Sequence, residues 1–223
     1  MGQLELRRRI LETDSGLLPN IYQHIEYVQR GTSVSNTAGY NSTYWMPAGD
    51  KQLDIYTGAM AIAQQADSAG GYVCGSRQNN SSDTVGYGIY FDQNTTRIGM
   101  FNGVSAYIEP EGGNSIRNIK YDLHAVWTPN SVSITDGTHS DSNTGTSRAI
   151  VSNTSVFGCV AYNSSQLRHG LKGRIYYLRI YEDGELKVNF IPCRRLEDDM
   201  VGFYDTVSQT FRSNGNYTAG PDV

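Results

Sequence analysis

The chain is a succession of short alternating segments separated by turn residues, and this pattern limits the folds that it can adopt. The clearest case runs from Gly173 to Arg195, GRIYYLRIYEDGELKVNFIPCRR, where Asp-Gly separates two runs rich in aromatic and β-branched residues. An Asp-Gly pair in this setting is a strong signal for a tight β-hairpin. We therefore expect one strand on each side of a turn at Asp183 and Gly184.

Other parts of the chain show the same period of two, which is typical of strands. They are residues 21–31, 53–65, 87–108, 118–138 and 155–165. The first residues, 3–13, give the one convincing helix pattern, so the chain has no second helical region from which to build β-α-β units. The sequence thus predicts an all-β protein, an antiparallel β-sandwich of the jelly-roll type with a short N-terminal helix or arm.

The chain is predicted to have one domain and one appendage. Its 223 residues suit a single β-sandwich domain, which we place at residues 18–223. Residues 1–17 form the predicted arm, where a block of three arginines lies between apolar residues and Asp14-Ser15-Gly16 ends the pattern. This arm is interpreted either as a capping helix packed on the domain or as an attachment segment that docks on a partner.

Composition excludes several classes of function. The 18 Lys and Arg residues against 22 Asp and Glu residues give a net charge of -4, which argues against an extended nucleic-acid surface. No stretch approaches the roughly 18 apolar residues of a membrane-spanning helix, and the first residues have no apolar signal-peptide core. We expect neither nucleic acid nor membrane as a partner.

The odd number of cysteines rules out a complete set of intramolecular disulfides. They are Cys74, Cys159 and Cys193, and no Cys-x-x-Cys or Cys/His cluster suggests zinc. We expect three buried or half-buried thiols, with one disulfide plus a free thiol as the alternative.

The first strand of the Gly173–Arg195 hairpin carries large side chains on both faces. The face with Leu178 is the better core candidate, so the face with Tyr177 and Arg179 needs another cover. Residues 202–223 keep several aromatic side chains, and we expect this tail to fold back over that face. A neighbouring subunit or a ligand are the alternatives.

Two stretches resemble a known family. HIEYVQRGTS, from His24, and the end of the chain, from Gly173 through VGFYDTVSQTFRSNGNYTAGPDV, resemble concanavalin A-like (laminin G-like) jelly-roll domains. They are similar to domains of tail, fibre, capsid-decorating and other virion-associated proteins of bacteriophages and prophages. Such domains also occur in bacterial surface proteins. The resemblance covers roughly residues 18–223, with specific ends and a generic middle, and implies two packed, curved sheets.

The resemblance implies a role as well as a fold. It favours a non-enzymatic virion structural or accessory protein that displays a lectin-like domain for attachment to host-surface glycans. The N-terminal arm would bind other virion proteins, and a homo-oligomer is expected because virion appendages are symmetric. The alternative is a carbohydrate-binding module or adhesin on a bacterial cell surface.

The acidic residues do not form a catalytic pattern. Glucanases of this fold place three carboxylates on one strand in a Glu-x-Asp-x-x-Glu pattern, and EPEGG, EDGE and LEDD do not match it. The four histidines are scattered, and His24 and His124 lie inside predicted strands as packed or surface residues. We therefore predict no enzyme activity.

One loop is the best candidate for sugar contact. In YNSTYWMPAGD the aromatic Trp45 follows Tyr44 and precedes Asp50. Sugar binding needs a ring for the apolar sugar face and polar groups for hydroxyls, so we predict that these three residues contact carbohydrate. The alternative is that Trp45 closes the edge of the sandwich.

Polar loops supply the metal candidates. TDGTHSDSN carries Asp136, Asp141 and Asn143, whose oxygen atoms suit calcium. The resemblance implies calcium as a possible ligand at the rim of the domain, and no cofactor is expected to be required. QNNSSDT, with Asn79, Asn80 and Asp83, is an equal candidate. The alternative is that both loops are simply solvated.

Overall fold

The computed structural model describes residues 17–31, 41–43, 45–65, 70–77, 86–102, 104–145, 153–161, 167–214 and 216–223. Strands β1 to β19 in these ranges form an 11-stranded and an 8-stranded sheet. The pairs are antiparallel except for a short parallel contact between β5 and β13. The prediction of an antiparallel β-sandwich is confirmed. The predicted arm, residues 1–17, lies outside the described residues except for Leu17.

The first sheet contains most of the C-terminal half of the chain. Its central order is β11-β10-β9-β4-β15-β16-β17-β18, and β1, β2 and β19 pair onto its upper part. The strands are β1 (Tyr22–His24), β2 (Val28–Arg30), β4 (Leu53–Ala61), β9 (Tyr121–Thr128), β10 (Ser131–Thr135), β11 (Ser140–Thr144), β15 (Gly173–Glu182), β16 (Glu185–Arg195), β17 (Val201–Asp205), β18 (Thr210–Arg212) and β19 (Tyr217–Ala219).

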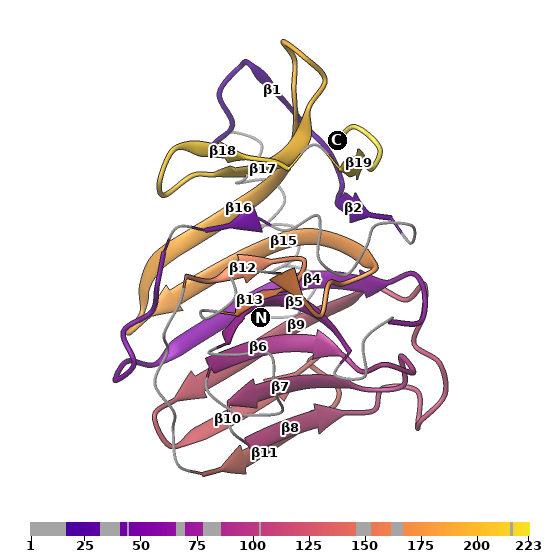
Figure 1. Cartoon of the computed structure of the whole chain (residues 1–223), viewed down its shortest axis with the longest axis vertical. Coiled ribbons are helices and arrows are strands. Elements are labelled where there is room, and N and C mark those ends of the chain that lie inside the picture. The colour runs from indigo at the N-terminus through magenta and orange to yellow at the C-terminus, as the bar shows by residue number, and fades with distance from the viewer. Residues whose placement is uncertain are drawn as a thin grey trace.

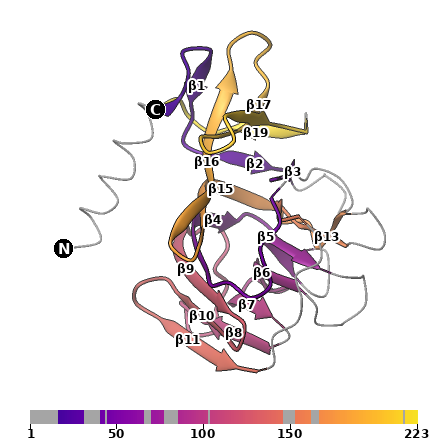
Figure 2. The same ribbon diagram turned by 90° about the vertical axis from the view of Figure 1, so that its left-hand side faces the viewer.

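The second sheet has the order β14-β13-β5-β6-β7-β8; β12 also pairs with β5, and β3 pairs with β12. Its strands are β3 (Asn41–Ser42), β5 (Gly71–Arg77), β6 (Gly86–Phe91), β7 (Ile98–Asn102), β8 (Val104–Ile108), β12 (Ser155–Val156), β13 (Cys159–Ala161) and β14 (Leu167–Arg168). Figure 1 shows β6, β7 and β8 in front of the first sheet, and the side view of Figure 2 shows the two layers facing each other.

The core lies between the two layers and follows from alternation along the strands. In β9 every second residue is buried, and Trp127 at its end is fully buried. Leu53 and Ile55 of β4 point the same way, and Ile89 and Phe91 of β6 close the core from the second sheet. Burying such large apolar side chains stabilises the fold by roughly 1.5–3 kcal/mol each.

The predicted hairpin turns where the sequence indicates. Asp183 and Gly184 have φ values of 46° and 81° and separate β15 from β16. Positive φ at both central residues is the type I′ geometry that an Asp-Gly pair favours. The second predicted turn, at Pro129 and Asn130, is also present between β9 and β10.

The two faces of β15 differ from the prediction at one point. The register with β4 shifts between Ile175 and Tyr177, so a bulge changes which side chains face inward. Ile175 and Leu178 are therefore both buried in the core, although strict alternation places them on opposite faces. The sequence gives no local sign of this extra residue.

The expectation that the tail covers the outer face of β15 is wrong for the described residues. Strands β17 and β18 instead extend the first sheet beyond β16, and β19 pairs with β2. Phe203 of β17 and Tyr217 of β19 both contact Phe157, which lies between β12 and β13 of the second sheet. The outer face of β15 is left half-exposed, with Tyr177 and Arg179 partly accessible.

The cysteine prediction is confirmed for two of the three residues. Cys74 and Cys193 are free, buried thiols, and burial raises the pKa of each to about 12. Such thiols are protonated and unreactive at neutral pH. The side chain of Cys159 lies outside the described residues. None of the described segments contains a helix that is long and apolar enough to span a membrane.

The hairpin turn gives a test of the fold. We expect Gly184→Val to lower the free energy of unfolding by about 1–2 kcal/mol, because a β-branched residue is strained at positive φ although the space around Gly184 is open. The matched control is Glu185→Val, the next residue, which lies in a regular strand. Equal denaturant midpoints for the two variants would contradict the type I′ assignment.

Candidate functional site

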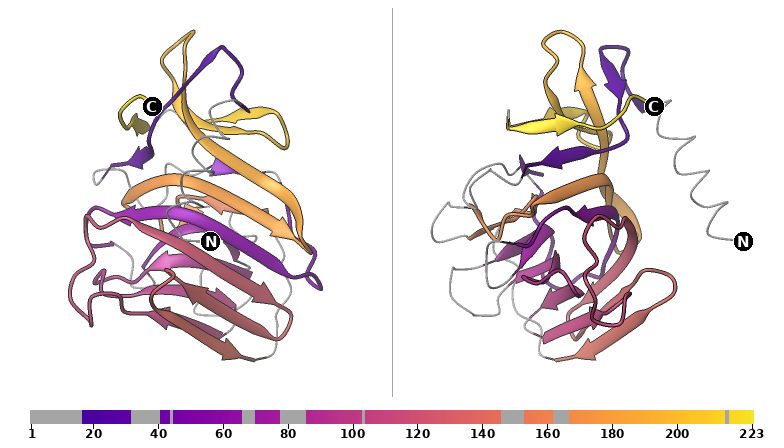
Figure 3. Two further views of the ribbon diagram at one scale, coloured as in Figure 1. Left: turned by 180° about the vertical axis from the view of Figure 1, so that it is seen from behind. Right: turned by 90° about the vertical axis from the view of Figure 1, so that its right-hand side faces the viewer.

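The outer face of the first sheet brings side chains from five strands into line. Strands β15, β4, β9, β10 and β11 are neighbours, and every second residue of each strand points away from the core. One cross-strand row consists of Arg179, Tyr56, His124, Thr135 and Ser140. The next row consists of Tyr181, Asp54, Val126, Ser133 and Ser142. Figure 3, left, shows this sheet from outside.

Three aromatic rings form a rigid group in the middle of these rows, which we call the aromatic platform: Tyr56, His124 and Tyr181. The rings of Tyr56 and His124 stack with centroids 4.2 Å apart and an interplanar angle of 5°. Tyr181 meets Tyr56 edge-on at 5.9 Å. Such aromatic pairs add roughly 0.5–1.5 kcal/mol beyond burial, so the platform is held in place before any ligand arrives.

A carboxylate fixes the orientation of the imidazole. Asp54 Oδ1 lies 3.2 Å from His124 Nε2, and Asp54 Oδ2 accepts a hydrogen bond of 2.8 Å from Gln52 Nε2. Burial raises the pKa of Tyr56, and the charge of Asp54 and the neighbouring Tyr181 raise it further. Tyr56 is therefore a neutral phenol at physiological pH, able both to donate and to accept a hydrogen bond.

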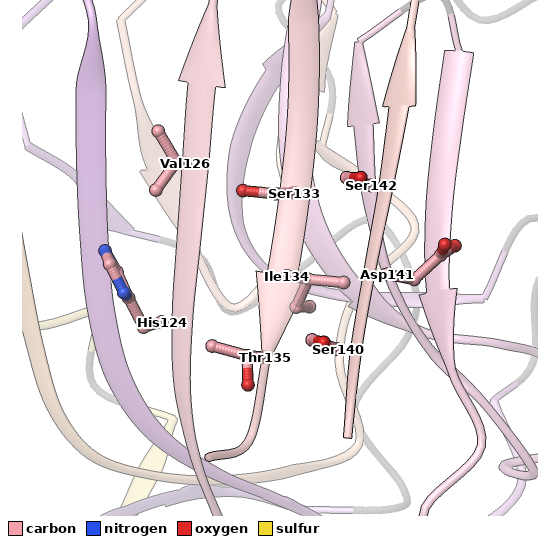
Figure 4. A pocket seen from close by; sticks show the side chains of 8 residues that line it. All are labelled: His124, Val126, Ser133, Ile134, Thr135, Ser140, Asp141 and Ser142. Atoms are coloured by element: carbon pink, nitrogen blue, oxygen red, sulfur yellow. The ribbon is translucent and has the colours of Figure 1, made fainter. Parts of the chain in front are cut away.

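An open pocket of about 420 Å³ adjoins the platform. Figure 4 shows its lining: His124, Val126, Ser133, Ile134, Thr135, Ser140, Asp141 and Ser142. The Thr135 hydroxyl donates to the carbonyl of His139 and accepts from the amide of Gly137. Among the described residues, the hydroxyls of Ser133, Ser140 and Ser142 have no hydrogen-bond partner, so they are available to a ligand.

This arrangement combines a fixed ring surface with uncommitted hydroxyl groups. A ring supplies contact for an apolar face, and hydroxyls both donate and accept hydrogen bonds. Pockets that bind small molecules commonly pair apolar surface with a few convergent polar groups. A ligand that suits the pocket must therefore offer a flat apolar face beside groups that donate and accept.

The sequence prediction for sugar contact falls on a different part of the molecule. Tyr44 lies outside the described residues. Trp45 is half-buried and packs against the core, and its carbonyl accepts the Thr43 hydroxyl and the Thr154 amide. This placement fits the alternative in which Trp45 closes the edge of the sandwich.

Asp50, the third predicted sugar residue, is exposed in a turn next to the β15–β16 hairpin. Its neighbours hold that turn in place, because Lys51 pairs with Asp183 at 2.9 Å and the Gln52 amide donates to the same carboxylate. Asp50 thus lies at the hairpin tip. Sugar contact by Trp45 and Asp50 stays a prediction.

The three predicted calcium ligands serve two separate structural roles. Asp136 accepts hydrogen bonds from the amides of Thr138 and His139 and from the imidazole of His139. Burial raises the pKa of Asp136, but these hydrogen bonds outweigh it and hold the pKa below its usual value. Asp136 therefore stabilises its own turn.

Asp141 and Asn143 instead close the open edge of the second sheet. Asp141 Oδ2 accepts the Tyr107 amide at 2.8 Å, and Asn143 Nδ2 donates to the Ser105 carbonyl at 3.1 Å. Both partners lie on β8, the edge strand whose outward backbone groups would otherwise be unpaired. In Figure 4 Asp141 points toward that neighbouring strand.

Within the described ranges, no group of three His, Cys, Asp or Glu residues could hold a metal ion. The second candidate loop, with Asn79, Asn80 and Asp83, lies outside those ranges. Calcium binding stays a prediction.

Sequence reasoning missed the aromatic platform and the serines beside it. Asp54, Tyr56 and His124 are alternate residues of two ordinary strands, and His124 was expected to be a packed or surface residue. The signal that unites them is the pairing of β4 with β9, which places Tyr56 opposite His124. The residues of each strand do not indicate which strand it pairs with.

Comparisons with known proteins agree with the fold. No family model matches the chain, and no curated protein matches its sequence. The heptameric SAP-like pentraxin from Limulus polyphemus superposes with a TM-score of 0.54 at 10% identity, over 92% of this chain and 98% of that chain. At this identity the likeness speaks for the jelly-roll fold alone.

Two further structures resemble the chain less closely. Domains LG4-5 of the mouse laminin α1 chain have a TM-score of 0.48 at 15% identity, over 73% of this chain. The match spans 44% of the laminin chain, which is less than half of its length. The CBM40 of the Ruminococcus gnavus IT-sialidase has a TM-score of 0.46 at 10% identity, over 69% of this chain and 90% of that chain.

The contacts between β11 and β8 give a test that separates a structural role of Asp141 from a role in metal binding. We expect Asp141→Ala to lower the free energy of unfolding by about 1 kcal/mol in chelator and to speed hydrogen exchange at the Tyr107 amide, because that amide loses its acceptor. Asp50→Ala, at an exposed carboxylate, is the matched control. A loss of stability that appears with calcium and is absent in chelator would instead identify Asp141 as a metal ligand.

Proposed function

We propose that this chain is a non-catalytic carbohydrate-binding domain whose site is the aromatic platform together with the adjoining pocket. The observation that carries the proposal is the Tyr56–His124 stack beside the unpartnered hydroxyls of Ser133, Ser140 and Ser142. A sugar ring offers a flat C–H face to an aromatic ring and hydroxyls that both donate and accept. In the pocket His124 supplies the ring, with Tyr56 stacked behind it, and the three serines supply the hydroxyls.

The residues that line the pocket support ligand binding without catalysis. Hydrolysis of a glycosidic bond requires two carboxyl groups that flank it. The pocket lining contains one carboxylate, Asp141, and an oxygen of that group already accepts the Tyr107 amide. Asp54, beside the platform on the same face, contacts His124 and accepts a hydrogen bond from Gln52. Neither carboxylate is arranged with a partner across the pocket.

The proposal also concerns the biological setting of this domain. The resemblance of the end motifs supports a structural or accessory protein of a phage virion, attached to other virion proteins through residues 1–17 in a homo-oligomeric assembly. Display on such an assembly would multiply weak sugar contacts into firm attachment to a host-surface glycan. A bacterial cell-surface adhesin is the alternative setting.

The setting is tested by locating the chain. Mass spectrometry of purified particles, induced from the cells that encode it, is expected to detect the chain at a stoichiometry that fits a symmetric appendage. Recovery from the cell-surface fraction of uninduced cells, with none in the particles, would replace the virion with the bacterial surface. A glycan-binding assay with and without chelator tests in parallel whether calcium contributes.

The sugar site is tested by removing its central ring. We expect Tyr56→Ala to weaken binding on a glycan array and in calorimetry by about tenfold or more, because it removes the ring that supports His124 and shapes the platform. Tyr107→Ala is the matched control, a half-buried tyrosine on the second sheet that packs against Tyr90. Equal affinity of the two variants would contradict this location of the site.

A further inference from the structure

Within the part of the chain that the structure describes, the charged groups in and next to the pocket are mainly carboxylates. None of the eight lining residues is Arg or Lys, and the ionisable members are His124 and Asp141. Asp54 binds the imidazole of His124, and Asp122 lies on the same outer face two residues along β9. With a net charge of -4 on the whole chain, the local field adds to a general repulsion of anions.

Two cations of this face, among the residues that the structure describes, are engaged elsewhere. Arg179 stands two strands from His124 and donates from Nε to Asn189 Oδ1 at 3.1 Å. Lys120 Nζ lies 3.9 Å from Asp122 and 4.3 Å from the ring centroid of Tyr176. Neither cation is part of the pocket lining, so a ligand carboxylate in the pocket would lack a charged partner there.

The rows also determine how a long ligand can lie. Neighbouring strands are about 4.8 Å apart, so the four intervals from β15 to β11 span about 19 Å. Along this line the surface changes from Tyr181 and Tyr56 through His124 to the serines of β10 and β11. A chain of sugars lying across the strands contacts rings at one end and hydroxyls at the other.

From these observations we infer that the site selects uncharged oligosaccharides and discriminates against the corresponding uronic-acid chains. This inference rests on the proposed function and names the chemical class of its ligand. An uncharged sugar can exchange hydrogen bonds with the hydroxyls of Ser133, Ser140 and Ser142 and carries no charge that the nearby carboxylates would repel. A sugar carboxylate would lie near the charges of Asp54 and Asp141, and the lining has no lysine or arginine to offset this repulsion.

The experiment compares pairs of oligosaccharides that differ at one carbon. The probes are β-1,4-linked glucose and mannose oligosaccharides and their C6-oxidised counterparts, the glucuronate and mannuronate chains, on one array with a wide panel of other neutral and acidic glycans. We expect the uronates to bind roughly three- to tenfold more weakly than their neutral partners. This difference in affinity should become smaller between about 0.1 M and about 1 M salt, because the screening length falls from about 10 Å to about 3 Å.

A substitution adds a positive charge to the pocket. Ser142→Arg places a cation at an exposed position of an edge strand, where it should fold normally. We expect this variant to gain affinity for the acidic glycans and to lose the preference for neutral ones. Thr218→Arg, at an exposed position of β19 outside the pocket, is the matched control and should keep the original preference.

The outcomes separate this inference from the proposal on which it rests. Uronates or other acidic glycans that bind as tightly as the neutral ones would overturn the charge selectivity and leave carbohydrate binding in place. A folded chain that binds no glycan on the array would overturn both. A neutral preference that Ser142→Arg does not change would show that the selectivity arises outside this pocket, and would also overturn the inference.

Discussion

The alternation of buried and outward residues along the central strands of the first sheet is the constraint on which the rest of the structure depends. Leu53, Ile55 and Trp127 must face the second sheet, and this fixes the register of β4 against β9. The same register places Tyr56 opposite His124 on the other face. The site is thus a consequence of the core, since a slip of one residue would bury the aromatic platform and expose the core.

The second constraint is the closure of the sandwich at its lower edge. Strand β8 ends the second sheet and β11 ends the first, and side chains of β11 bond the free backbone of β8. This arrangement protects an edge that could pair with another chain. It also leaves the alternate residues of β11, Ser140 and Ser142, facing outward to line the pocket. One strand therefore serves the edge with one face and the site with the other.

Much of the fold follows from the sequence, and less of the site does. Turn chemistry at Asp183-Gly184 and alternation along β9 are local signals, so both hairpins and the sandwich were predictable. The bulge beside Tyr176 and the path of the tail depend on pairing between distant strands, which one sequence does not reveal. For the same reason the sequence favours Trp45, an aromatic residue in a polar loop, as a sugar contact. Tyr56 and His124 are separated by 67 intervening residues and meet only through the β4–β9 pairing.

The most direct test of this account is to map the bound sugar on the protein. Backbone amide shifts would be followed by NMR during titration with the neutral oligosaccharide that binds most tightly on the array. We expect the largest shifts on β4, β9, β10 and β11, around Tyr56, His124 and Ser142. Shifts centred on residues 45–52, or on the outer face of the second sheet, would contradict it and place carbohydrate binding elsewhere.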